Sequence, residues 1–282
     1  MLVRLAAELR QTLGAALPVA SLFSAPTVAG VARLVASGAP AGDALAPVLM
    51  LHPGDSRPPL FCLPPASGLT WQFAALKRYL DVPIIGLQSP SLSGLPLPDS
   101  MAALAAAHAD RIAAIAPNGP IRLLGWSFGG ALARCLAAEL VSRGRSVTFV
   151  GMLDTRRSAA AGDVASLLTE LGFEIPSPDL SIADAVALIR ASDDPVAALT
   201  DAQIALVVEN YLASDRLMAA ATYPAYDGEV FFVEAALSGT ASAGWPDLPR
   251  LQKHDLAVTH SEMLDPATLG KLGPLLAEAL QD

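Results

Sequence analysis

Residues 124–130 read Leu-Gly-Trp-Ser-Phe-Gly-Gly and place one hydroxyl nucleophile among three glycines. Glycine inside regular structure costs roughly 0.5–1 kcal/mol relative to alanine, so three of them indicate a sharp turn or a close approach of other atoms. An apolar run over 121–126 precedes Ser127, and a helical pattern over 128–144 follows it. This strand–turn–helix context predicts that the Gly-x-Ser-x-Gly turn presents the serine as a catalytic nucleophile. A purely structural turn serine is the alternative.

A serine hydroxyl is a weak nucleophile at its own pKa and needs a neighbouring base. The chain has four histidines. Where such a turn carries the nucleophile, the chain order is serine, acid, histidine, and this order excludes His52 and His108. His254 has a charged residue on either side, which is typical of a solvated surface position. His260 lies between an apolar stretch and the last helical pattern, so we expect His260 to be the base.

Two carboxylates are candidates for the acid that orients this histidine. Asp154 ends the apolar stretch 146–154, and Glu234 lies near the end of the stretch 229–235. The ends of parallel strands meet at one edge of a sheet, so both carboxylates are expected near His260. The residues alone do not decide between them, and either is equally compatible with a solvent-facing position at a strand end.

A developing oxyanion needs two backbone N–H donors. The first is expected from Phe128, directly after the nucleophile, and the second from the loop after the first core strand. That loop is Pro-Pro-Ala-Ser-Gly over 64–68. Pro64 and Pro65 have no N–H, so Ala66 is the first donor that the loop offers. An ordinary Pro-Gly turn is the alternative for this loop.

Strand and helix patterns alternate from residue 59 onward, which predicts an α/β fold with a mostly parallel sheet and helices on both faces. The expected strands are 60–63, 83–87, 121–126, 146–154, 229–235 and one near 255–259, and the expected helices are 69–80, 100–115, 128–144 and 267–280. The alternation is interrupted at about 155–222 by three helical segments without a strand. A helical insertion of this kind is a candidate lid.

The chain divides into three parts by composition. Residues 1–37 have helical patterns, and residues 38–58 are rich in Gly, Pro, Ala and Asp, which is typical of a linker. The α/β pattern occupies residues 59–282. The segment 11–32 carries no charge, but its prolines interrupt it and we expect neither membrane insertion nor secretion.

A formal net charge of −9 without a basic cluster disfavours nucleic acid and anionic membranes as partners. Cys62 and Cys135 both lie in apolar stretches and are expected to be buried thiols in a reducing cytoplasm. The sequence contains neither CxxC nor HExxH, and we expect no metal and no cofactor bound to this chain.

Four motifs, in residues 60–90, 123–133, 149–155 and 259–264, together resemble the C-terminal type I thioesterase domain of nonribosomal peptide synthetases, and most of all the enterobactin-synthetase type. The resemblance covers about residues 59–280. It implies an α/β-hydrolase fold with a variable helical lid over an acyl pocket.

The resemblance also bears on individual residues. In that family the triad acid follows the strand after the elbow helix, which implies Asp154 rather than Glu234. Pro64 departs from the histidine that many members carry before the oxyanion loop, although some peptide cyclases of the family have a proline pair there. The implied catalytic set is therefore Ser127, Asp154 and His260.

Residues 1–37 resemble the later helices of a peptidyl carrier protein. Such carriers attach 4′-phosphopantetheine to the serine of a Gly-Gly-x-Ser-Leu motif, and that serine would fall just before Met1. We therefore expect a fragment of a larger synthetase, working as a monomer with an upstream carrier protein in cis.

The resemblance implies that Ser127 takes a peptidyl or depsipeptidyl chain from the carrier's phosphopantetheine thioester and releases it by macrocyclisation, after joining several units in the enterobactin-type case. The alternatives are hydrolytic release as a linear acid, a type II proofreading thioesterase or esterase, and a catalytically inactive module that only docks carrier proteins. The acyl chain, the ring size and the attacking group are not named by the sequence.

Overall fold

A computed structural model describes residues 9, 12–13, 28–36, 44–157, 161–175, 177, 179–192, 194–238 and 244–281. The α-helices are α3 (Val28–Ala36), α4 (Met101–Ile115), α5 (Phe128–Ser142), α6 (Val164–Glu170), α7 (Ile182–Arg190), α8 (Asp201–Ala219) and α9 (Pro266–Ala279). The strands are β1 (Val48–His52), β2 (Leu60–Leu63), β3 (Ile84–Leu87), β4 (Ile121–Trp126), β5 (Val147–Leu153), β6 (Val230–Ala235) and β7 (Leu251–Leu256). Short 3-10 helices are η1 (Trp71–Arg78), η2 (Pro90–Ser93) and η3 (Pro195–Ala198).

The described strands form one seven-stranded sheet in the order β1-β3-β2-β4-β5-β6-β7. Only β1 pairs antiparallel, with β3, and the remaining pairs are parallel. The predicted α/β class with a mostly parallel sheet is confirmed. In a parallel sheet the carboxyl ends of neighbouring strands meet at one edge, which is where ligands and catalytic groups gather in open α/β folds.

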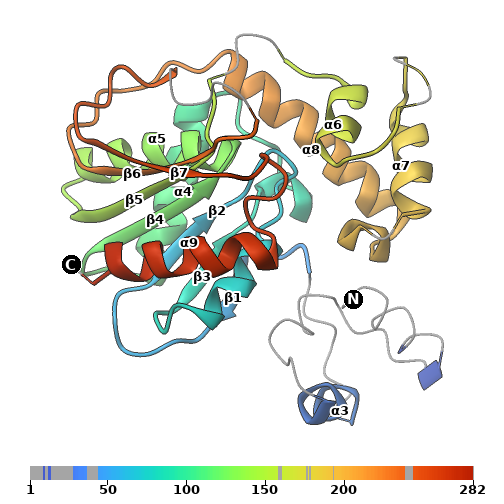
Figure 1. The fold of residues 1–282 in the computed structure, drawn as a ribbon, viewed down its shortest axis with the longest axis horizontal. Helices are drawn as coiled ribbons and strands as arrows, with labels where there is room; N and C mark the ends of the chain where they lie inside the picture. The colour runs from blue at the N-terminus through green and yellow to red at the C-terminus, as the bar shows by residue number, and fades with distance from the viewer. Residues whose placement is uncertain are drawn as a thin grey trace.

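Two apolar cores lie on the two faces of the sheet, because strand side chains alternate between faces. Phe61 and Leu123 are buried against α4 and α5, whereas Leu60 and Leu124 are buried against η1 and α9. Figure 1 shows α9 across one face of the sheet and α4 and α5 on the other. The strands are therefore buried on both sides, as continuous apolar runs such as residues 60–63 predict.

The amino-terminal boundary of the α/β unit was predicted too late. Strand β1 lies inside the range 38–58 that was predicted to be a linker, and Val48 pairs with Leu87 of β3. The Ala44 carbonyl also accepts hydrogen bonds from the side chains of Trp71 and Gln88, both at 2.9 Å. Strand β1 has only five residues and lies among glycines and prolines. Its apolar pattern is therefore too short to be detected from composition.

Two further elements differ from the sequence prediction. The helix expected over 69–80 is the shorter 3-10 helix η1, Trp71–Arg78. Strand β7 covers Leu251–Leu256 rather than 255–259, because an edge strand with solvent-facing residues has no apolar run to detect. His254 consequently lies within β7, half-buried, with its ring 4.6 Å from that of Phe231, and the prediction of a solvated position for it was wrong.

The segment between β5 and β6 is helical, as predicted. Helices α6, α7 and α8 gather beyond one side of the sheet, at the right of Figure 1. Each begins at a residue whose side chain caps the helix by accepting a hydrogen bond from the backbone N–H three residues later. The caps are Asp163, Ser181 and Thr200, and the donors are Ser166, Asp184 and Gln203. None of the helices in the described part of the chain is sufficiently long and apolar to cross a bilayer.

One histidine belongs to the core. His108, on α4, is completely buried, and neither ring nitrogen has a hydrogen-bond partner among the described residues. Burial, with the nearby charge of Arg111, lowers the pKa of His108 from 6.5 to about 3. The folded protein therefore keeps this imidazole neutral at pH values where the unfolded chain protonates it.

This burial predicts an acid-dependent loss of stability. Because the folded pKa lies below the unfolded one, unfolding takes up a proton between pH 6.5 and about 3, and stability falls as the pH falls through that window. Replacing His108 by Leu removes the uptake, so the stability of His108→Leu relative to wild type should increase by up to about 1.4 kcal/mol per pH unit below pH 6.5. Denaturant titrations from pH 7 to pH 4.5 measure this, and parallel pH profiles for the two proteins would contradict it.

Candidate active site

The turn between β4 and α5 holds Ser127 in an unusual backbone conformation. Its φ is 56° and its ψ is −123°, in the positive-φ region that residues with a side chain rarely adopt. The Ser127 N–H donates to the Leu153 carbonyl at 2.9 Å, and the Ser127 carbonyl accepts from Gly130 N–H at 3.0 Å. These bonds hold a strained turn at the start of α5, as a nucleophile elbow requires.

The three glycines around Ser127 allow α5 to approach the sheet. A β-carbon on Gly125 would lie 2.0 Å from the Gly129 carbonyl oxygen, and one on Gly129 would lie 2.5 Å from the Leu63 carbonyl oxygen. A β-carbon on Gly130 would lie 1.8 Å from the hydroxyl oxygen of Thr155. The amino end of α5 is therefore packed directly against backbone at the ends of β2 and β4.

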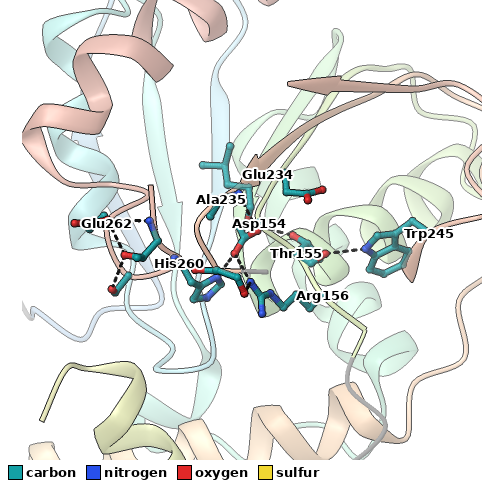
Figure 2. Close-up of polar contacts among 12 residues, drawn as sticks. Asp154, Thr155, Arg156, Glu234, Ala235, Trp245, His260 and Glu262 are labelled. Carbon is teal, nitrogen blue, oxygen red and sulfur yellow. Dashed lines mark hydrogen bonds and ion pairs between the residues drawn. The ribbon is translucent and has the colours of Figure 1, made fainter. Parts of the chain in front are cut away.

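Asp154 directly follows β5, on the strand that pairs with β4. Trp126 pairs with Leu153, so Ser127 and Asp154 leave adjacent strands at the same edge. The Asp154 side chain is completely buried, and its Oδ2 lies 2.6 Å from Nδ1 of His260. Figure 2 shows His260 and Arg156 converging on this carboxylate. The other oxygen, Oδ1, accepts the Ala235 N–H at 3.0 Å.

The surroundings keep Asp154 ionised. Burial by itself would raise its pKa, but hydrogen bonds from His260 and from the Ala235 N–H, together with the positive charges of His260 and Arg156, outweigh burial and lower the pKa. Arg156 contributes through Nη2, which is 3.4 Å from Oδ2 and 3.1 Å from the Ser238 carbonyl. An ionised carboxylate on Nδ1 fixes the histidine tautomer and leaves Nε2 as the basic nitrogen.

His260 is held from its backbone and from its ring. Its N–H donates to the Ser238 hydroxyl at 2.5 Å. Its ring centroid lies 5.3 Å from that of Trp126, the residue immediately before Ser127. Thr259 is held in turn by the Glu262 carboxylate, which accepts from its N–H at 2.8 Å and its hydroxyl at 2.7 Å. The imidazole therefore lies beside the turn that carries Ser127.

Glu234, the other candidate acid, has a different partner. It lies inside β6, paired in register with Asp255 of β7, and its Oε2 is 3.1 Å from Nζ of Lys253. In Figure 2 its side chain lies outside the contacts that join Asp154 to His260. The remaining histidines lie on β1, α4 and β7. The structure thus brings together Asp154, His260 and the Ser127 turn.

The loop proposed to complete an oxyanion hole abuts the amino end of α5. A β-carbon on Gly129 would also lie 2.6 Å from the Pro64 carbonyl oxygen, so residues 64–66 run close to the turn. The loop is closed by a hydrogen bond from Gly68 N–H to the Pro65 carbonyl at 2.9 Å. No hydrogen bond among the described residues uses the N–H of Ala66 or of Phe128. Both N–H groups are therefore left to a ligand or to solvent.

Several supporting residues were not found by sequence reasoning. Arg156 and Ser238 contact Asp154 and His260, and Trp245 donates from Nε1 to the Thr155 carbonyl at 2.8 Å, directly after the acid. Arg156 and Thr155 follow the acid in the chain, which is a signal that could have been used. Ser238 and Trp245 lie between β6 and β7, and no motif marks them.

A mostly parallel sheet, a serine turn at positive φ and a buried Asp–His pair at the same strand edge define a serine hydrolase of the α/β-hydrolase fold. Residues 58–228 match the thioesterase domain family, and residues 1–35 match the phosphopantetheine attachment site family. The chain therefore belongs to the thioesterase domain family.

Curated relatives are large synthetases. The chain is 30% identical over 297 residues to enterobactin synthase component F of Escherichia coli (strain K12), covering 99% of this chain and 22% of the relative. It is 28% identical to a dimodular nonribosomal peptide synthase of Bacillus subtilis (strain 168), covering 99% of this chain and 13% of the relative. The chain thus spans less than a quarter of either relative.

Solved structures show the same fold. The NocB thioesterase domain, in covalent complex with a fluorophosphonate nocardicin G analog, is 26% identical with a TM-score of 0.67, covering 83% of this chain and 100% of that one. A four-domain nonribosomal peptide synthetase bound to AMP and glycine has a TM-score of 0.73 at 23% identity, covering 100% of this chain and 24% of that one.

The packing of the elbow predicts opposite effects for two glycine-to-alanine substitutions. Gly125→Ala should lower the free energy of unfolding by about 1–3 kcal/mol, because its β-carbon meets backbone that cannot move aside. Gly270→Ala is the matched control: it lies in α9 with its nearest such contact, Tyr79 Oη, at 3.9 Å, and should raise stability by about 0.5–1 kcal/mol. Denaturant unfolding of both variants measures these free energies. A Gly125→Ala variant with the free energy of unfolding of wild type would show that the turn has room for a β-carbon.

Proposed function

We propose that this chain releases an acyl chain from the phosphopantetheine thioester of a carrier protein through an acyl-enzyme on Ser127. The observation that carries the proposal is the 2.6 Å contact between buried Asp154 and Nδ1 of His260, beside the turn at Ser127. The match of residues 58–228 to the thioesterase domain family supports the reaction class. The match of residues 1–35 to the phosphopantetheine attachment site supports a carrier in cis as the donor.

In the first half-reaction, His260 accepts the hydroxyl proton of Ser127 on Nε2 while Oγ attacks the thioester carbonyl. The N–H groups of Phe128 and Ala66 stabilise the negative charge on the carbonyl oxygen. When the tetrahedral intermediate collapses, the C–S bond breaks and His260 returns its proton to the leaving thiolate. Asp154 stabilises the imidazolium that exists between the two proton transfers.

In the second half-reaction, His260 removes a proton from the attacking group, which adds to the ester carbonyl, and Ser127 leaves as the alcohol. A hydroxyl or amine of the acyl chain itself gives a macrocycle, and water gives a linear acid. We propose cyclisation on the resemblance of residues 59–280 to the enterobactin-synthetase type of thioesterase domain, and the 30% identity to enterobactin synthase component F supports that resemblance. A well-oriented internal nucleophile reaches effective molarities of about 10⁵ M or more, which is enough to compete with water.

The apolar composition of residues 155–222 does not itself argue for a water-excluding lid. Ile204, Val207 and Val208 of α8 are buried in the core on the α4 and α5 face. Their apolar character is thus explained by packing. The proposal that this segment covers the acyl pocket is supported by the position of α8 against the loop 64–68 rather than by its composition.

Substitution of the two candidate acids tests the catalytic assignment. Asp154→Asn should lower kcat by about 10⁴-fold, because the amide favours the wrong tautomer of His260. Glu234→Gln is the matched control, and its kcat should stay near that of wild type because Glu234 contacts Lys253 instead. Hydrolysis of an acyl N-acetylcysteamine thioester provides the assay. Equal losses in the two variants, or activity retained in Ser127→Ala, would refute the assignment.

Intact-protein and product masses distinguish the two outcomes of release. With a hydroxy-peptidyl N-acetylcysteamine thioester, we expect an acyl adduct that is absent in Ser127→Ala and a product lighter than the linear acid by one water. An adduct that yields only linear acid would assign hydrolysis, and products that contain two or more units would show that units are joined before release. The absence of any Ser127-dependent adduct would contradict the acyl-enzyme itself.

A further inference from the structure

A buried asparagine of α8 contacts the loop that is proposed to hold the oxyanion. Asn210 is 1% exposed, and its Nδ2 donates to the carbonyl oxygen of Ala66 at 2.7 Å. Its Oδ1 accepts from the hydroxyls of Ser89 and Ser91, both at 2.5 Å. Nδ2 also lies 3.3 Å from the hydroxyl of Ser214, one turn later on α8. A single amide thus joins α8, the start of η2 and residues 64–68.

The loop is closely packed around this amide. Gly68 has a φ of +84°, and a β-carbon there would lie 2.6 Å from Nδ2 of Asn210 and 2.9 Å from the β-carbon of Ser89. The Ser89 N–H also donates to the Gly68 carbonyl at 3.0 Å. The loop 64–68 is therefore held between η2 and α8. Asn210 of α8 bonds both to the loop, at Ala66, and to the start of η2, at Ser89 and Ser91.

Packing of α8 on the core does not by itself require an amide at this position. Ile204, Val207 and Val208 on the same helix are buried with apolar side chains. A buried amide is costly unless its hydrogen bonds are made, so its placement here directs α8 to one position on the loop. The carbonyl to which Asn210 donates belongs to Ala66, and the N–H of Ala66 is the proposed oxyanion donor.

The Ala66 N–H lies in the same peptide plane as the Pro65 carbonyl, which accepts from the Gly68 N–H at 2.9 Å, and the bond from Asn210 anchors the other side of Ala66. Pro65 restricts the backbone before Ala66, because its ring fixes its own φ. The bond from Asn210 restricts the backbone after Ala66, because it fixes the plane of the next peptide. It also keeps the Ala66 carbonyl oxygen on a donor of α8, so this partial negative charge does not turn toward the oxyanion.

We propose that Asn210 is a positioning residue that couples α8 to the oxyanion loop, so that the Ala66 N–H is aligned only when α8 is seated on it. This inference rests on the proposed function, and in particular on the role of Ala66. It predicts that the placement of the helical segment over the site changes the rate of the chemical step, and not only the shape of the acyl pocket.

Asn210→Asp tests the coupling with little change of shape. The carboxylate still accepts from Ser89 and Ser91 but has no hydrogen to donate to Ala66. We expect kcat for acyl transfer from a short acyl N-acetylcysteamine thioester to fall by about 10- to 100-fold, part of the roughly 10²–10³-fold effect of losing one oxyanion donor, with KM nearly unchanged. Protonation of the new carboxyl group restores a donor, so the ratio of variant to wild-type kcat should rise as the pH falls. Because the titration of the catalytic base His260 affects both proteins alike, it cancels in this ratio.

Ser214→Ala is the matched control, because it removes another hydrogen bond of the same amide on the same helix and leaves the bond to Ala66 in place. Its kcat should stay close to that of wild type. Ser91→Ala is a milder second variant at a half-buried position, which keeps the proposal testable if Asn210→Asp does not fold. It loosens the amide from η2 and should lower kcat by about two- to tenfold with KM again unchanged.

The outcomes separate this inference from the proposed function. Loss of all turnover in Ser127→Ala, with full kcat in folded Asn210→Asp, would overturn the coupling and leave the proposed function intact. A loss confined to KM, or an equal loss of kcat in Ser214→Ala, would also overturn it. Activity that survives in Ser127→Ala would instead refute the proposed function.

Discussion

At Ser127 the chain passes from β4 into α5 with a φ of 56°, a conformation that is costly for any residue other than glycine. Such strain persists only where the surroundings over-determine it, and here they do. The turn is bonded to β5 through Leu153, and the glycines behind it let α5 close onto backbone of β2 and β4. The same close approach brings the amino end of α5, where the Phe128 N–H has no hydrogen bond among the described residues, next to the loop 64–68. The position of the Ser127 turn and that of the proposed oxyanion donors, Phe128 and Ala66, therefore depend on one packing contact.

The second constraint is a buried charge. Asp154 also has a positive φ, of 38°, and its carboxylate is removed from solvent. A buried carboxylate remains ionised only when charged or N–H donors replace water, and His260, Ala235 and Arg156 supply them. These partners come from the loop before α9, the end of β6 and the residues after β5. The carboxylate thus joins three segments that are far apart in the chain, and it orients the imidazole as a result.

The helical segment between β5 and β6 contributes to the site through polar contacts as well as through packing. Its helix α8 is buried along one side in the core, and the side-chain amide of Asn210 donates to the Ala66 carbonyl in the loop 64–68. In the proposed function, this contact connects the helical segment to the loop that supplies the Ala66 N–H.

Much of this protein was determined by its sequence alone. The fold class, the strand–turn–helix unit at Ser127 and the helical insertion follow from short-range patterns: apolar runs, glycines at a turn and helical spacing. The order of serine, acid and histidine excluded His52 and His108, and the charged neighbours of His254 left His260 as the expected base. These features depend on neighbours within a few residues, which is why the chain shows them directly.

Other features were decided only by the tertiary structure. Strand β1 and the start of β7 are edge strands with too little apolar pattern to be detected, and their assignment depends on hydrogen bonds to β3 and β6. Asp154 and Glu234 are equivalent by local sequence, and their side chains differ only in which partner the fold places beside them: His260 for one and Lys253 for the other. Ser238, Trp245 and Asn210 contact the site across 22, 90 and 144 positions of the chain. No local pattern records a contact of that range, because only the packing of the sheet and helices brings those atoms together.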